Sequence, residues 1–263
     1  MKIASLAIGQ YIPGKSLLHR MDPRSKILAM TAIIVCLFLI KQAWGYAAFG
    51  ALMVLGILTS KVGLRFMARS MRSLLVIMAF TFILHMFMTE GSAIFSIGPL
   101  TATYEGAAQG GLMVARLILL VVATSLVTLT TSPLTLTDGL EKLMKPLTAI
   151  GFPAHELAMM MTIALRFIPT LVEETEKIMK AQMARGADFS SGNLIKRAKA
   201  MLPVLIPLFV SAFRRADDLA LAMEARCYRG GKGRTRLRKL QFTAADLGAL
   251  PIVALSVALA VLA

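Results

Sequence analysis

Long apolar stretches separated by short polar connections run along most of this chain. Five stretches reach or approach the roughly 17–25 residues that a helix needs to cross a bilayer. They are residues 27–40, 43–60, 73–88, 106–131 and 244–263. We therefore expect an all-α polytopic membrane protein with about five transmembrane helices.

Residues 132–243 follow a different pattern. Residues 154–184 place apolar side chains at three- and four-residue spacing and carry charges in their last turns, which predicts a long amphipathic helix. A second long helix is predicted to end at Ala225-Arg226-Cys227, just before Gly230-Gly231. Ahead of both, Thr137-Asp138 predicts the N-cap of a short amphipathic helix.

The distribution of charge orients these segments. The chain has a formal net charge of +15, 57% hydrophobic residues and a mean hydropathy of +0.73. Five Lys or Arg lie in residues 1–26, four in 61–72 and eighteen in 132–243, whereas the two remaining connections hold one. Because Lys and Arg accumulate on the cytoplasmic side, the N-terminus is predicted inside and the C-terminus outside.

This orientation divides the chain into three parts. Residues 1–131 hold an N-terminal segment and four spans, residues 132–243 form a cytoplasmic block, and residues 244–263 form the last span. A nucleic-acid-binding protein would also be basic, but it would not carry several spans, so no nucleic-acid partner is expected. The lipid bilayer is the predicted surrounding of the spans.

A short repeat marks the predicted ends of the two long helices. The segments Ala184-Arg185-Gly186 and Ala225-Arg226-Cys227 place their arginines 41 residues apart. A cation in the last turn followed by glycine is also ordinary helix capping. Two copies at equivalent positions favour a second interpretation, in which each arginine projects and holds a carboxylate of a partner through two hydrogen bonds.

With these motifs the chain resembles the transmembrane (T) component of energy-coupling factor transporters, a branch of the ATP-binding-cassette systems that takes up vitamins and metals. The resemblance covers essentially the whole chain. It is carried by HRMDPRSK at 19–26, RFIPTLVEETEKIMKAQMARGADF at 166–189 and PLFVSAFRRADDLALAMEARCYRGG at 207–231. It implies a cytoplasmic coupling domain of long crossed helices that end in Ala-Arg-Gly-like motifs. Cys227 departs from that pattern, and cysteine adopts positive φ less readily than glycine.

The resemblance also implies a function without catalysis. The chain would link two cytoplasmic ABC-type ATPase subunits to one or more membrane-embedded substrate-binding (S) components, in the cell membrane of a bacterium or archaeon. The residues that dock on the ATPases would be Ala184, Arg185, Gly186, Ala225, Arg226 and Cys227. The N-terminal residues most resemble T components shared by several S components. A dedicated cobalt, nickel or biotin system is the alternative.

The segment GQYIPGKS at residues 9–16 matches the pattern of a phosphate-binding P-loop. The eight residues that precede Gly9 are too few for a strand within a sheet, Pro13 removes one backbone donor, and Pro23 limits the helix that should follow. We therefore expect a basic turn at the cytoplasmic membrane surface and no nucleotide site. His19, His85 and His155 show no metal-binding spacing, so no metal or cofactor is predicted.

Polar residues inside the predicted spans bear on a competing hypothesis, a permease that binds its own solute. Such a protein needs several polar groups at membrane depth, whereas these spans offer His85, Arg116 and a few hydroxyls. Buried groups of this kind require a partner or a wet cavity. Gly106 and Gly110 allow close helix approach, either to an S component or, more commonly, to another span of the same chain. Three consecutive methionines at 159–161 suit either a surface that adapts to several partners or simple gap filling.

Overall fold

The computed structural model describes residues 11–40, 42–72, 74–97, 100–189 and 191–231, together with Phe242, Asp246, Gly248, Ala254 and Ala258. The chain divides into two compact units. The N-terminal unit comprises Gln10–Leu140 and Leu240–Ala263, and the C-terminal unit comprises Glu141–Lys239 and Met1–Gly9. Helices dominate both units, which confirms the predicted all-α class.

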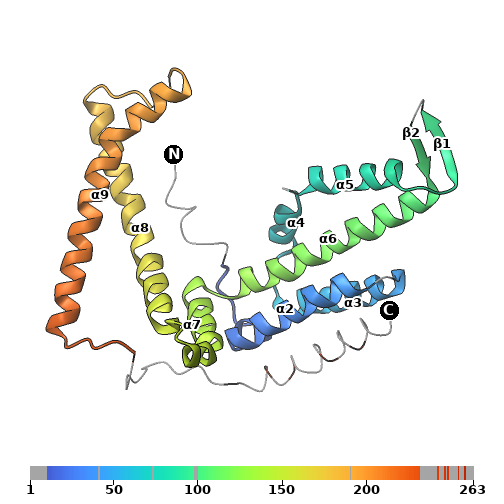
Figure 1. Ribbon diagram of the computed structural model, residues 1–263, viewed down its shortest axis with the longest axis horizontal. Coiled ribbons are helices and arrows are strands. Elements are labelled where there is room, and N and C mark those ends of the chain that lie inside the picture. The colour runs from blue at the N-terminus through green and yellow to red at the C-terminus, as the bar shows by residue number, and fades with distance from the viewer. Residues whose placement is uncertain are drawn as a thin grey trace. The chain divides into compact units, whose positions relative to one another are not determined.

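The N-terminal unit contains most of the predicted spans (Figure 1). Its elements are α1 (Leu17–Arg20), α2 (Pro23–Leu39), α3 (Ala43–Ser60), α4 (Leu64–Arg72), α5 (Leu75–Met88), β1 (Ala93–Ile97), β2 (Leu100–Thr103), α6 (Tyr104–Thr130) and the first turns of α7 (Pro133–Met144). The first four predicted spans are therefore helices, α2, α3, α5 and α6, and of these α3 and α6 are long and apolar enough to cross a membrane. The fifth, residues 244–263, lies outside the described residues apart from four isolated positions.

Helix α6 is the centre of this unit. Thr103 begins the helix by accepting a hydrogen bond from the N–H of Gly106 at 3.1 Å. Leu37 of α2, Phe49 of α3 and Leu126 of α6 belong to one buried apolar cluster, and the first two are fully buried. The long apolar run of α6 therefore serves as the surface on which α2 and α3 pack.

The two small residues of α6 pack inside the chain. A Cβ added at Gly110 would lie 3.1 Å from the backbone oxygen of Phe82, and one added at Gly106 would collide with the backbone oxygen of His85. Both oxygens belong to α5, which runs along α6 in Figure 1. Of the two interpretations of this glycine pair, internal packing is confirmed.

Arg116 and His85 find partners inside the N-terminal unit. Arg116 donates to the backbone oxygen of Ile40 at 3.2 Å and to the hydroxyl of Tyr46 at 2.5 Å. Its guanidinium also lies over the rings of Phe38 and Tyr46. His85 donates through Nδ1 to the backbone oxygen of Thr81 at 2.9 Å. The expectation that such groups need partners is confirmed, and the partners that hold them are neutral.

Two short elements were not predicted. The basic connection after α3 forms α4, and the connection between α5 and α6 forms an antiparallel hairpin of β1 and β2. The sequence of β1, AIFSI, combines aromatic and β-branched residues of the kind that strands favour. The strand propensity of residues 93–97 therefore shows in the sequence as well as in the structure.

Three helices among the described residues are long and apolar enough to cross a membrane: α3, α6 and α8 (Ala154–Ala184). The shorter α5 is apolar too. Helix α8 was expected in the cytoplasmic block. Its first half is as apolar as a membrane span, whereas its second half carries charged residues. These include Glu173, Glu174, Glu176 and Lys177. The helix therefore changes from apolar to charged along its length.

The C-terminal unit is built on α8 and α9 (Leu194–Ala225), two long helices side by side. They run antiparallel, because Glu174 of α8 pairs with Arg215 of α9 at 2.8 Å and Gln182 of α8 donates to the backbone oxygen of Pro203 at 3.5 Å. That oxygen is available because Pro207, one turn later, has no N–H to donate to it. Figure 1 shows the pair with the ends of the two helices at opposite tips.

The short helix before this pair differs from its predicted form. It begins at Pro133, after Ser132, and continues to Met144, so the N-cap predicted at Thr137-Asp138 is wrong. Proline is favoured at the first helical position because its missing N–H has no partner there anyway. A 3-10 helix, η1 (Lys145–Ile150), follows and ends at Gly151 with φ of 86°.

Candidate functional site

The first Ala-Arg-Gly motif forms the C-terminal end of α8. Ala184 is the last helical residue and Arg185 is the C-cap. Gly186 adopts φ of 89°, its N–H donates to Met183 O at 3.0 Å, and the next N–H, of Ala187, donates to Gln182 O at 3.0 Å. This pair of bonds satisfies helix carbonyls that would otherwise lack donors. The predicted cap at Gly186 is confirmed.

The second motif forms the same turn at the end of α9, although it has no glycine. Arg226 is the C-cap and Cys227 adopts φ of 54°. The N–H of Cys227 donates to Glu224 O at 2.8 Å, and that of Tyr228 donates to Met223 O at 3.0 Å. The hydrogen bonds link the same relative positions as in the first motif. Replacement of the usual glycine therefore leaves the geometry of the turn intact.

Both arginines extend from these turns into solvent. Arg185 and Arg226 are exposed, and within the described part of the chain neither guanidinium makes a hydrogen bond or an ion pair. Each therefore keeps five N–H donors for an external acceptor. Because α8 and α9 are antiparallel and each spans about 45 Å at 1.5 Å per residue, the two arginines lie at opposite tips of the pair.

The surroundings of the two tips differ, in a way that the sequence did not reveal. The Tyr228 hydroxyl, two residues after Arg226, lies 3.3 Å from Nε2 of His155 in the first turn of α8. Nδ1 of the same ring lies 3.1 Å from Oε1 of Glu141 on α7. Around Arg185 the hydrogen bonds include the one from Gln182 to Pro203 O of α9 and those between Ser191 and Asp188 in the connecting loop. We call the first group the corner cluster (Glu141, His155 and Tyr228).

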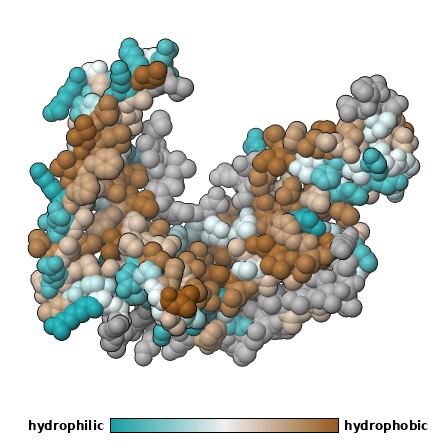
Figure 2. Space-filling model, in the orientation of Figure 1, coloured by the Kyte–Doolittle hydropathy of each residue, from teal (hydrophilic) through white to brown (hydrophobic). Residues whose placement is uncertain are grey.

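An apolar groove lies between α8 and α9. Its volume is about 360 Å³. Ile163, Phe167 and Leu171 of α8 line one wall, and Ala216 and Met223 of α9 are among the residues of the other. The groove and the exposed apolar side chains around it give this unit a large hydrophobic surface, drawn in brown over α8 and α9 in Figure 2.

Several large side chains extend this surface beyond the groove. Met160 and Met161 of α8 are 54% and 43% exposed, and Phe209 and Phe213 of α9 are 61% and 68% exposed. Such an area of exposed apolar side chains is typical of a surface that contacts another protein or lipid. The methionines are therefore surface residues, and gap filling does not account for two of the three.

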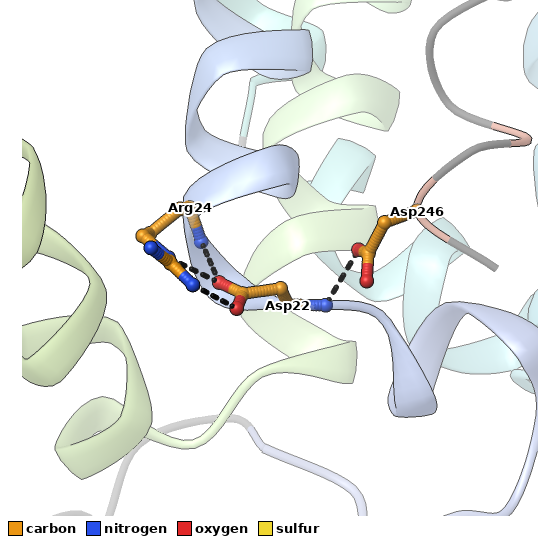
Figure 3. A network of polar contacts seen from close by, with 3 residues as sticks. All are labelled: Asp22, Arg24 and Asp246. Carbon is orange, nitrogen blue, oxygen red and sulfur yellow. Dashed lines mark hydrogen bonds and ion pairs between the residues drawn. The ribbon is translucent and has the colours of Figure 1, made fainter. Parts of the chain in front are cut away.

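The motif HRMDPRSK forms a polar network in the N-terminal unit (Figure 3). Arg24 donates to both carboxylate oxygens of Asp22, at 3.1 and 2.8 Å, and its backbone N–H donates to the same group. The backbone N–H of Asp22 donates to Asp246 at 2.7 Å. Burial by itself raises the pKa of Asp22, but the bonds from Arg24 outweigh it and leave the pKa below its usual value.

Lys26 belongs to the same region and lies just before the apolar stretch that begins at Ile27. Its side chain is buried, and Nζ donates to Thr130 O at 3.1 Å and to Thr131 Oγ1 at 2.9 Å. Through Lys26 the motif therefore holds the C-terminal end of α6, directly before α7 begins.

The described part of the P-loop-like segment, residues 11–16, is a turn attached to α6. Ile12 donates through its N–H to Leu129 O at 3.0 Å. His19 accepts from the Ser16 hydroxyl at 2.6 Å and donates to Ile12 O at 3.0 Å. The helix that follows, α1, has four residues, too few for the helix of a P-loop. Gly14 fits because a Cβ there would lie 2.7 Å from the His19 ring.

Known proteins are similar to this chain over nearly its whole length. Residues 14–237 match the family described as CbiQ, cobalt transport protein. The energy-coupling factor transporter transmembrane protein EcfT of Thermosediminibacter oceani is 60% identical over 245 residues, which cover 93% of this chain and 92% of that protein. EcfT of Acidaminococcus fermentans is 54% identical over 261 residues, covering 99% and 97%. EcfT of Bacillus subtilis is 49% identical over 243 residues, covering 92% of each.

Proposed function

This chain belongs to the EcfT family, the transmembrane (T) components of energy-coupling factor transporters, and from that premise we propose that it couples two cytoplasmic ATPases to a separate substrate-binding S component. The T component would carry movement between these partners and would bind neither ATP nor solute. Uptake of a vitamin or another micronutrient would be the result.

The observation that carries this proposal is the pair of exposed arginines at opposite tips of α8 and α9. Ala184, Arg185 and Gly186 would dock on one ATPase, and Ala225, Arg226 and Cys227 on the other. A helix end of fixed geometry presents a guanidinium in a defined direction, which favours two hydrogen bonds to a carboxylate of the partner. Two tips about 45 Å apart, set by helices of this length, allow each ATPase its own contact.

The apolar surface of α8 and α9 supports a second contact, with an S component. Met160, Met161, Phe209 and Phe213 would pack against an apolar helix of that protein or against lipid. Methionine is flexible and polarizable, so one surface could accept several different S components. Because the same two helices carry the arginine tips and the apolar surface, movement of the tips would move the S component.

The orientation follows from charge. The N-terminus would lie in the cytoplasm and the C-terminus outside, because residues 1–26, 61–72 and 132–243 carry nearly all of the Lys and Arg. This orientation would place both arginine tips on the side where ATP is available.

Co-purification of the full complex tests the docking role. The chain would be expressed with its two ABC-type ATPases and captured through a tag, with Arg185→Glu and Arg226→Glu combined in one variant. Reversal of both charges should remove the ATPases from the captured complex and leave membrane insertion unchanged. A matched control reverses Lys177 of α8 and Arg214 of α9, two exposed cations away from the helix ends, and should retain the ATPases. Retention by the motif variant would contradict the docking role.

A dedicated metal or biotin transporter is a second candidate, favoured by the description of the matched family as cobalt transport protein. The number of different S components that co-purify from native membranes separates the two, since a shared module brings several and a dedicated one brings one. Transport by this chain alone in liposomes would instead indicate a self-contained permease.

A further inference from the structure

We propose that His155 is a positioning residue that braces the second arginine tip, so that movement of an ATPase at Arg226 passes directly into α7. This inference rests on the proposed docking of ATPases at the two tips and adds a mechanical difference between them.

Both nitrogens of the His155 ring are used in the corner cluster. Nδ1 faces the Glu141 carboxylate at 3.1 Å, and Nε2 faces the Tyr228 hydroxyl at 3.3 Å. A carboxylate accepts, so Nδ1 carries a proton and donates, and Nε2 accepts from the tyrosine in the neutral ring. One side chain therefore connects α7, the start of α8 and the segment after α9.

The backbone after Tyr228 also fits closely against this ring. A Cβ added at Gly231 would lie 2.6 Å from Cδ2 of His155 and 2.7 Å from Cγ. A distance this short requires the ring or the backbone to move, so glycine is needed for the close approach. The packing of Gly231 is independent of the two hydrogen bonds and indicates the same brace.

The brace shortens the path between Arg226 and α7. Arg226 and Tyr228 are two residues apart, and Tyr228 reaches Glu141 of α7 through one imidazole. Near Arg185, by contrast, Gln182 connects α8 with Pro203 of α9 and Ser191 contacts Asp188 within the loop, and neither of these contacts reaches α7. Helix α7 leads back along the chain to α6. The second tip is therefore the stiff connection and the first tip the more independent one.

Transport per ATP hydrolysed, measured with the complete complex in proteoliposomes, tests this inference. Tyr228→Phe removes one hydroxyl and keeps the ring, His155→Ala removes the whole bridge, and Gly231→Ala displaces the ring. Each should lower the ratio about threefold to tenfold, the effect expected from loss of one or two hydrogen bonds, while both ATPases still co-purify. His155→Gln, which retains a donor and an acceptor, should restore part of the ratio.

The matched control is Gln182→Ala, which removes a side-chain contact near the first tip and should leave the ratio unchanged. An unchanged ratio in Tyr228→Phe and His155→Ala would overturn the inference, as would an equal loss in Gln182→Ala. Loss of an ATPase in Tyr228→Phe would assign Tyr228 to docking and overturn it as well. Failure of the proposed function is seen separately, because the unaltered chain would then capture no ATPase.

Discussion

The ends of α8 and α9 form the same turn from different residues. Gly186 and Cys227 both adopt positive φ, at 89° and 54°, and the two N–H groups that close each turn donate to carbonyls at the same relative positions. The difference lies outside the turns, because Tyr228 after α9 contacts His155 at the start of α8, whereas Gln182 at the end of α8 contacts Pro203 of α9.

The comparison shows that two different sets of contacts act on each arginine. One set fixes its position at the helix end, and the other connects that end to the remaining chain. The hydrogen bonds of the turn hold each C-cap arginine in place, and they do so even where a side chain replaces glycine. The contacts beyond the turn decide how a force on that arginine reaches the remaining chain. Under the proposed function, the two motifs would be equivalent as docking groups and would differ in how they transmit force to α7.

Single substitutions of the two arginines test their equivalence as docking groups and should have the largest effect. Arg185→Ala and Arg226→Ala each remove one charged partner, and a hydrogen bond to a charged group contributes about 1.5–3 kcal/mol. Each variant should weaken binding of one ATPase by about 10- to 100-fold, measured by titration of the purified chain in nanodiscs. A large loss for one arginine with none for the other would show that the tips are not equivalent.

Of the two residues with positive φ, Gly186 and Cys227, substitution of Gly186 by alanine should destabilise the protein more. Gly186→Ala places a side chain at φ of 89°, at a cost of about 1–2 kcal/mol, although the added Cβ would meet no atom beyond its neighbours along the chain within 4 Å. Cys227→Ala exchanges one side chain for another at the same kind of position and should change stability by less than about 0.5 kcal/mol. Melting temperatures in detergent compare the two, and an equal loss would contradict the role of positive φ.

Restoration of glycine at the second turn should have the smallest effect and the opposite sign. Cys227→Gly relieves the αL conformation of a non-glycine residue but gives the unfolded chain more freedom, so the net gain should be about 0.5 kcal/mol. Transport should be retained. A loss of transport in this variant would mean that the thiol itself has a role.

The sequence alone predicted the parts of the fold that depend on local pattern. Helix α6 was placed within two residues because its long apolar run is limited by Thr103 and Thr131, both in extended conformation. The glycine that caps α8, Gly186, was also predicted from a local pattern, the segment Ala184-Arg185-Gly186 after the last charged turn. The start of α7 was predicted at Thr137, a good N-cap residue, but the helix begins at Pro133. Proline is favoured at the first helical position, because its missing N–H has no partner there.

Contacts between distant residues were beyond such reasoning. His155 and Tyr228 are 73 positions apart, and nothing near either residue indicates that the end of α9 returns to the start of α8. The partners of Arg116 were missed likewise, because Ile40 O and Tyr46 lie about 70 or more positions away. The Ala-Arg repeat was visible in the sequence, while the equal geometry of its two turns required the structure.

Reactivity of Cys227 tests the central claim most directly, because this thiol is exposed directly after Arg226 whereas the chain's other cysteine, Cys36, is buried. A membrane-impermeant maleimide would be added to inside-out vesicles with and without the two ATPases, with Cys227→Ala as the blank. Docking at the second tip predicts rapid labelling of the free chain and strong protection when the ATPases are bound. Equal labelling in both conditions, or labelling from the outer side of the membrane alone, would contradict the account.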